Sequence, residues 1–360
     1  MGRTLTAAQA RAIGAILSQD RASTKERVRA SGLPPRTFQA AQARATEAAW
    51  VAERIVPDPV LFGRPRVTIA WARPAPGDPG EIGPRWQQLD DAALVWAGPD
   101  FVFAVCFDPE EGETPIAAEM RRGKARYRRT YRLEASLRTP ALPVYFDFEA
   151  EWSQIAGIPG MVHYPRPFPR APRGAPRPAP SPRWREIVDR LVRSDGVLAP
   201  LSEPGAPGLI DRLTLRRAAV RAFASGWVDA RAFLNPVGLP SVGGWTPANV
   251  VFVQGRLKAN RRPEVLLRTL IVGCRVHPFL FATDGAELLF ATLSPAPGGI
   301  ERAVPVAPTL DRFLERITVL REPIEGLAAL VPHRYEVITA PASGARAGRA
   351  LEESPPTPSG

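Results

Sequence analysis

Residues 22–50 read ASTKERVRASGLPPRTFQAAQARATEAAW, and this stretch decides the fold of the first part of the chain. A short helix over 24–30 is expected to end at Gly32, because glycine adopts the left-handed conformation that closes a helix. Two prolines then open a third helix over 34–49, as proline does in a first turn. With a first helix over 6–19, the segment predicts three short helices with a glycine turn before the third. This is the pattern of a helix-turn-helix.

The third helix has an apolar stripe and an exposed polar face. The stripe consists of Phe38, Ala41, Ala45 and Ala48. The polar side carries four predicted DNA-reading residues, Arg36, Thr37, Gln39 and Arg44. The strand over 51–56 and the Pro57-Asp58-Pro59 turn are expected to form a wing, in which Arg54 is a predicted phosphate contact. The alternative is a structural three-helix bundle with a solvated charged face.

Charge points to a polyanionic partner. The 47 basic residues exceed the 36 acidic ones and give a net charge of +11, and only three of the basic residues are lysines. Arginine suits phosphates and base edges, and a basic excess favours nucleic acid. GC-rich coding would explain the choice of arginine over lysine but not the net sign.

The sequence offers little for catalysis or metal binding. Cys106 and Cys274 lie far apart, and three scattered histidines share no ligand spacing. No nucleotide-binding, hydrolase or metalloprotease motif occurs. We therefore expect no metal, no cofactor and no enzymatic activity. No run has the length and apolarity of a membrane span or a signal peptide, which indicates a cytoplasmic protein.

Two low-complexity segments divide the chain. Residues 162–182, VHYPRPFPRAPRGAPRPAPSP, predict an extended polyproline linker, and 340–360 predict a disordered tail. On either side of the linker, an offset of 177 aligns Trp50 with Trp227 and Arg54 with Arg231, and an offset of 187 aligns Phe103 with Phe290. The chain is therefore interpreted as a duplicated unit.

The rear part of each unit has the order βαββαβ. In the first unit the elements are expected at 67–72, 85–92, 93–97, 101–107, 115–127 and either 144–148 or 134–138. In the second they are expected at 249–255, 263–270, 279–282, 288–293, 309–320 and 327–331. This order is the ferredoxin-like split βαβ arrangement, in which one sheet face is free to pair with a second copy.

The fold class is thus α+β, with two repeats of a winged helix-turn-helix followed by a βαββαβ ferredoxin-like domain. The expected domains are 1–64 and 183–243 (winged helices), 65–160 and 244–339 (ferredoxin-like), 161–182 (linker) and 340–360 (tail). The second winged helix is degenerate, because its middle segment LAPLSEPGAPG (198–208) is broken by proline and glycine. Its third helix, 211–225, carries the further predicted DNA contacts Arg216, Arg217 and Arg221.

This layout resembles the Lrp/AsnC (feast/famine) family of transcription regulators. The resemblance lies in the helix-turn-helix above, in VPDPVLFGRPRVTIAW (56–71) and in LVWAGPDFVFAVCF (94–107). It implies a regulator that binds double-stranded DNA and an amino-acid-like effector between its effector domains. The hairpin residues nearest to such a site are Gly98, Asp100, Gly285 and Glu287, for which simple β-turn chemistry is the alternative. Because two units are joined, one chain could form an intramolecular pseudo-dimer and could associate further.

Two other classes remain open. Siroheme decarboxylases are built from the same two modules, and a haem-biosynthetic enzyme of this kind is the alternative function. Such enzymes usually use histidines of their effector domains, whereas His277 and His333 are isolated here and no HCY-type segment occurs. The third possibility is an interaction scaffold whose winged helices bind protein.

Overall fold

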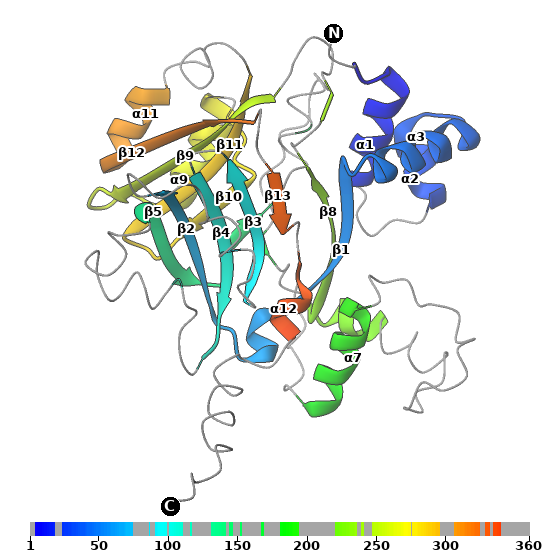
Figure 1. The fold of residues 1–360 in the computed structure, drawn as a ribbon, viewed down its shortest axis with the longest axis horizontal. Helices are drawn as coiled ribbons and strands as arrows, with labels where there is room; N and C mark the ends of the chain where they lie inside the picture. The colour runs from blue at the N-terminus through cyan, green and yellow to red at the C-terminus, as the bar shows by residue number, and fades with distance from the viewer. Residues whose placement is uncertain are drawn as a thin grey trace, which may run out of the picture.

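Figure 1 shows the chain, a computed structural model, as a mixed α+β fold with two sheets, a two-stranded ribbon and peripheral helices. The structure describes residues 4–18, 24–74, 86, 91–98, 101–110, 116, 131–141, 144–146, 152, 167–168, 181–193, 220–235, 239–240, 247–274, 276–295, 306–324, 328–331 and 334–339. The predicted α+β class is confirmed at this level.

The three predicted N-terminal helices are present as α1 (Ala7–Ser18), α2 (Thr24–Ser31) and α3 (Pro35–Glu47). A capping box starts α1, because Thr6 Oγ1 accepts a hydrogen bond from Gln9 N at 3.2 Å and Gln9 Oε1 accepts one from Thr6 N at 2.9 Å. Gly32 has φ 64° in the turn before α3. These helices bury their apolar stripes against each other and against Trp50 and Val51.

The predicted wing is wrong. Strand β1 (Val51–Pro57) pairs antiparallel with β8 (Val228–Leu234), 177 residues further along the chain, in a two-stranded ribbon. The turn residues do not form a hairpin, because the Asp58 carboxylate accepts a hydrogen bond from Val60 N and starts the 3-10 turn η1 (Pro59–Phe62). The Asp58 amide continues the ribbon instead and donates to Trp227 O at 2.8 Å.

The first sheet has the order β13-β3-β4-β2-β5. Its strands are β2 (Arg66–Pro74), β3 (Ala92–Gly98), β4 (Phe101–Asp108), β5 (Tyr131–Pro140) and β13 (Ala328–Val331). The alternative at 134–138 is thus the correct position for the last strand of the first unit. The helices predicted at 85–92 and 115–127 lie mostly outside the described residues.

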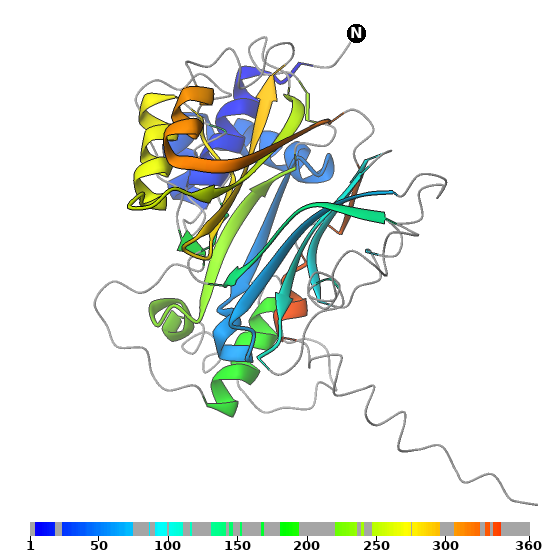
Figure 2. The ribbon, with the colours of Figure 1, turned by 90° about the vertical axis from the view of Figure 1, so that its left-hand side faces the viewer.

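The second sheet has the order β12-β9-β11-β10-β6-β7. Its strands are β6 (Val144–Phe146), β7 (Pro167–Phe168), β9 (Pro247–Leu257), β10 (Leu280–Thr283), β11 (Glu287–Pro295) and β12 (Leu314–Pro323). Three helical segments cover its outer face, α9 (Pro263–Arg268), the π-helical turn η2 (Thr269–Gly273) and α11 (Val306–Phe313). In Figure 2, α9 and α11 lie on the side of this sheet that faces away from the first sheet.

The helix predicted at 309–320 is wrong in its second half. Helix α11 ends at Phe313, and the chain continues directly as strand β12. The three consecutive β-branched residues Ile317, Thr318 and Val319 favour a strand, and Thr318 and Val319 pair with Gln254 and Val253 of β9.

Each half of the chain contributes a strand to the other half's sheet. Strand β6 follows β5 along the chain but pairs with β10 of the second sheet. In the same way, β13 follows β12 but pairs with β3 of the first sheet. Part of the predicted linker also joins the second sheet, because β7 pairs with β6; as a Pro-containing strand at the sheet edge, it obeys the usual restriction on proline.

An aromatic cluster fills the space between the two sheets. It consists of Trp71, Trp96, Phe101, Phe103, Phe252 and Phe279, all buried. The Trp71 ring stacks on Phe101 with centroids 4.3 Å apart and lies 4.4 Å from Phe252 of the other sheet. Each such side chain contributes about 1.5–3 kcal/mol through burial. The sheet faces expected to pair with a second copy therefore pack against each other within one chain.

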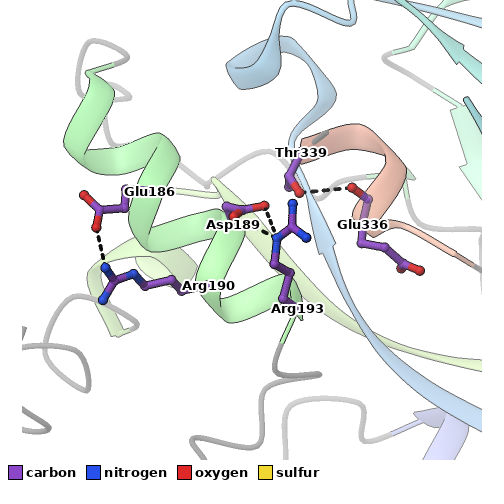
Figure 3. A network of polar contacts seen from close by, with 6 residues as sticks. All are labelled: Glu186, Asp189, Arg190, Arg193, Glu336 and Thr339. Carbon is purple, nitrogen blue, oxygen red and sulfur yellow. Dashed lines mark hydrogen bonds and ion pairs between the residues drawn. The ribbon is translucent and has the colours of Figure 1, made fainter. Parts of the chain in front are cut away.

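Two further helices lie beside the ribbon. Helix α7 (Pro182–Arg193), predicted at 184–194, packs Ile187 and Leu191 against the ribbon and η1. The short helix α12 (Glu336–Thr339) contacts α7, and Figure 3 shows the two side by side. Most of the segment predicted to form the second winged helix, including 198–208 and 211–219, lies outside the described residues.

Candidate functional site

The exposed face of α3 carries all four residues predicted to read DNA. Arg36, Thr37, Gln39 and Arg44 are exposed, because Phe38, Ala41 and Ala45 turn the opposite face into the core. An ion pair between Arg27 Nη2 and Glu53 Oε1, 2.5 Å apart, joins α2 to the ribbon. The helix-turn-helix is therefore held on the two-stranded ribbon.

At the centre of the ribbon, Arg54 lies opposite Arg231. These two residues are also equivalent under the sequence offset of 177, so the pairing coincides with the internal repeat. The same holds for the ends of the ribbon, where the pair Val51–Leu234 corresponds under that offset to Val228–Pro57. The two halves of the ribbon are thus related by an approximate twofold axis between the two arginines.

The two central arginines have different surroundings. Arg231 is buried, and its Nε donates to Asp229 Oδ2 at 3.0 Å. Arg54, predicted as a wing phosphate contact, is half-buried within the ribbon, and its Nη1 donates to Glu53 O at 3.0 Å. Tyr335 is nearby: burial raises the pKa of its phenol well above the usual value, and Arg231 and Arg54 oppose this shift.

The predicted second DNA-binding helix is described only at its end. Residues 220–224 are helical and Arg221 is exposed. Arg216 and Arg217 lie outside the described residues. Their contact with DNA stays a prediction.

The predicted effector residues occupy two hairpins. Gly98 ends β3 beside Phe101, and a Cβ at this position would come within 2.3 Å of the Phe101 ring. Gly285 has φ 96° between β10 and β11. Glu287 accepts a hydrogen bond from Gln254 Nε2 at 3.2 Å. Asp100 lies outside the described residues.

Gln254 connects this hairpin to the other sheet. Its side-chain amide accepts from Ser136 N at 2.9 Å and donates to Ser136 O at 2.8 Å, as a neighbouring strand would. Gly285 and Glu287 therefore lie near an edge where the two sheets meet. The close approach of the Phe101 ring, by contrast, is sufficient to explain why residue 98 is a glycine.

The alignment at offset 187 matches strand residues whose side chains lie on opposite faces of the two sheets. Phe103 belongs to the core between the sheets, whereas Phe290 faces α9 and α11. A shift of one residue moves a strand side chain to the opposite face. The phase is lost at the hairpins, since Gly98 pairs with Phe101 across a two-residue turn, while Thr283 pairs with Leu288 across a longer one.

Sequence reasoning missed a buried polar network at one end of the first sheet. Arg64 Nη1 donates to Asp91 Oδ1 at 2.7 Å, and the Arg64 side chain is buried. Beside it, Asp108 Oδ2 accepts from Thr68 Oγ1 and Arg138 Nε, each at 2.7 Å. These partners are 27 to 40 residues apart, so no local motif marks them.

Cys106 lies close to this network. Burial raises the pKa of its thiol well above the ordinary value, with a further increase from Asp108 and Asp91. A thiol held in its neutral form is a poor nucleophile. In the part of the chain that the structure describes, no three His, Cys, Asp or Glu side chains form a metal-binding group. The helices described are also all too short or too polar to cross a membrane.

Comparisons with known proteins give structural matches only. No family model and no curated protein sequence matches the chain. The crystal structure of the siroheme decarboxylase NirDL is similar, with 11% sequence identity, a TM-score of 0.45, and coverage of 96% of this chain and 100% of that one. The same enzyme in co-complex with an iron-uroporphyrin III analogue gives 12% identity, a TM-score of 0.42, and coverage of 91% and 96%.

This finding contradicts the expectation that the chain is not an enzyme, because both of these similar structures are those of an enzyme. At such low identity and TM-score, no residue role is transferred from them. No family model and no sequence match supports a regulatory function either.

Proposed function

We propose that the chain is a fused two-unit protein whose joined core carries its function, and that it acts on a carboxylate-rich tetrapyrrole, as siroheme decarboxylase does. The observation that carries this proposal is the reciprocal exchange of β6 and β13 between the two sheets. A chain that exchanges strands in this way keeps the core of a dimer permanently assembled.

Three features support a fused pair of equivalent units. The two four-stranded parts have equivalent strand orders, β5-β2-β4-β3 and β12-β9-β11-β10. The ribbon register coincides with the offset of 177. The first helices of both units also cross the ribbon, since α1 contacts β8 and α7 contacts β1. These three features support the predicted double repeat.

The sheets that form the core, rather than the helices that would read DNA, are the part that both units retain. A symmetric operator requires two equivalent reading helices, but residues 198–208 of the second unit contain three prolines and two glycines. The four-stranded parts of both sheets, in contrast, have the same strand order. The net charge of +11 suits a substrate with several carboxylates. Because aromatic side chains fill the described space between the sheets, the tetrapyrrole would bind outside this cluster.

The test uses the purified full-length chain with iron-uroporphyrin III and with siroheme. Binding is expected to shift the Soret band and to saturate, and incubation with siroheme is expected to release carbon dioxide and give a product of correspondingly lower mass. The control is a basic protein of similar size and charge. If neither tetrapyrrole shifts its Soret band beyond this control, the proposal is wrong.

A second candidate function is DNA binding, which the exposed polar face of α3 favours. On this proposal, replacing Arg36 or Arg44 with alanine weakens specific binding by about 1–3 kcal/mol, the usual value of a good base contact. Arg190→Ala removes a partly exposed arginine of α7, outside the helix-turn-helix, and is the control. Equal affinity in all three variants and the wild type would exclude α3 as the reading helix.

A further inference from the structure

A group of basic side chains surrounds Phe313 at one edge of the second sheet. The segments 256–268 and 311–316 contain seven cations against three carboxylates. Pairing of Leu314 with Leu257 brings the junction of α11 and β12 next to the end of β9. We call Lys258, Arg261, Arg262, Arg312 and Arg316 the Phe313 patch; all five are exposed.

Aromatic and backbone contacts fix part of this patch. The guanidinium groups of Arg261 and Arg312 lie over the Phe313 ring, with Cζ 5.5 and 6.0 Å from its centroid. Stacking on a ring holds a guanidinium in place by its face and leaves its N–H edges available. Lys258 Nζ donates to Asp311 O in the last turn of α11. These contacts reduce the conformational freedom that a ligand would otherwise have to remove.

Within the described part of the chain, the arginines of the patch are not neutralised by ion pairs. None of its four arginines forms an ion pair with any residue in the described ranges. The neighbouring Glu315 lies instead against Arg256, at 3.7 Å. Arg316 adds a second anomaly, because it has φ 55° where β12 departs from its regular pairing with β9. A left-handed backbone conformation is strained in a residue other than glycine, and it is retained mainly where the surrounding structure or function requires it.

We propose that the Phe313 patch binds the phosphate backbone of nucleic acid, independently of α3 and of any tetrapyrrole. The patch lies at the end of α11, the start of β12 and the segment between β9 and α9, beside the edge strand of the second sheet. Exposed cations at a sheet edge suit an extended chain of anions. Arginine forks match phosphate oxygens two at a time. In Figure 1, α11 and β12 lie on the opposite side of the molecule from α1–α3. The patch is therefore a second contact surface and not an extension of the helix-turn-helix.

The test measures fluorescence anisotropy of two labelled DNA duplexes of unrelated sequence over a salt series, with the full-length chain. Arg261→Ala combined with Arg312→Ala is expected to weaken both duplexes by the same factor and to lower the slope of log K against log salt by about two, because each phosphate contact contributes about 0.9. Arg190→Ala combined with Arg193→Ala removes the same charge from α7 and is expected to leave the slope unchanged.

Arg316→Gly separates binding from folding. Glycine adopts φ 55° without strain, so this variant is expected to keep or increase the unfolding temperature while it loses duplex affinity. A wild-type chain that binds neither duplex, or a patch variant with the slope of the α7 control, overturns the proposal. A patch variant that loses only iron-uroporphyrin III binding overturns it as well and assigns the patch to the tetrapyrrole. Loss of duplex binding with unchanged tetrapyrrole binding supports it, whatever the outcome for the proposed enzyme.

Discussion

At the level of single residues, the buried charges of the ribbon are the most sensitive positions. Asp229 balances Arg231, which lies opposite Arg54 on the neighbouring strand. Asp229→Ala removes the carboxylate that accepts a hydrogen bond from buried Arg231, beside a second arginine, so we expect the free energy of unfolding to fall by about 3–5 kcal/mol. Urea denaturation followed by circular dichroism measures this change.

The matched control is an exposed pair of the same kind. Asp189 and Arg193 form an ion pair on α7, drawn in Figure 3, with side chains 30% and 57% exposed. Asp189→Ala is expected to cost only about 0.3–0.5 kcal/mol, as for other exposed pairs one helical turn apart. Equal losses in the two variants would mean that the environment of Arg231 is not different from that of a surface arginine.

Cys106 is expected to make the free energy of unfolding depend on pH in the alkaline range. Its folded-state pKa lies above the ordinary value of 9.0 because of burial and of nearby Asp108 and Asp91. Above this pH the unfolded chain loses the thiol proton while the folded chain keeps it, so stability falls by about 1.4 kcal/mol per pH unit until the folded pKa is reached. Cys106→Ala is expected to reduce this slope by the same amount. Parallel pH profiles for wild type and variant between pH 9 and 10 would contradict the assignment.

At the level of elements, local sequence patterns predicted the positions of helices better than they predicted which strands pair. The stripe of Phe38, Ala41 and Ala45 was sufficient to place α3 and its exposed face, since helix periodicity is a local property. In contrast, nothing within 51–57 indicates that β1 pairs with β8 rather than with a wing strand. Strand pairing is decided by distant segments. The alignment at offset 187 treated Phe103 and Phe290 as equivalent, but the turn between β10 and β11 is longer than that between β3 and β4, and the two side chains therefore lie on opposite faces of their sheets.

The same argument applies to the candidate site. Exposure of Arg36 and Arg44 followed from the helix pattern, but the burial of Arg64 did not, because its partner Asp91 is brought close only by the fold. The Phe313 patch was missed for a similar reason. It depends on the end of α11, which the sequence pattern extended to residue 320, into the strand.

The segment 328–339, which contains β13 and α12, links the two halves and can be tested as one element. Tyr335 is its buried anchor and stacks on Phe233 of β8 with centroids 5.3 Å apart. Tyr335→Ala is expected to lower the free energy of unfolding by about 3–5 kcal/mol, as for other buried aromatic residues. Tyr335→Phe keeps the ring and is expected to retain most of this stability. Hydrogen exchange should show faster opening of β13 in the alanine variant alone.

At the level of the whole molecule, two kinds of long-range contact keep the halves together. Backbone ladders join them at the ribbon, at β6–β10 and at β13–β3. The aromatic cluster joins them through side chains, with Phe103 and Phe252 only 4.7 Å apart across the two sheets. Neither kind depends on the covalent connection between the halves. The long-range pairings also imply slow folding, because distant strands must meet before the core can form.

These contacts predict that the linker can be cut without separating the halves. A protease site inserted within residues 171–180 lies beyond β7 and before α7, so cleavage leaves both exchanged strands and the ribbon intact. After cleavage, the two fragments are expected to co-elute in size-exclusion chromatography at the volume of the uncut chain, and to separate only in denaturant. As a control, Tyr335→Ala in the cleaved protein should weaken this association, because the anchor of the returning segment is lost. Fragments that separate under native conditions would show that the halves depend on the linker, and the interpretation of the chain as a fused dimer would then be wrong.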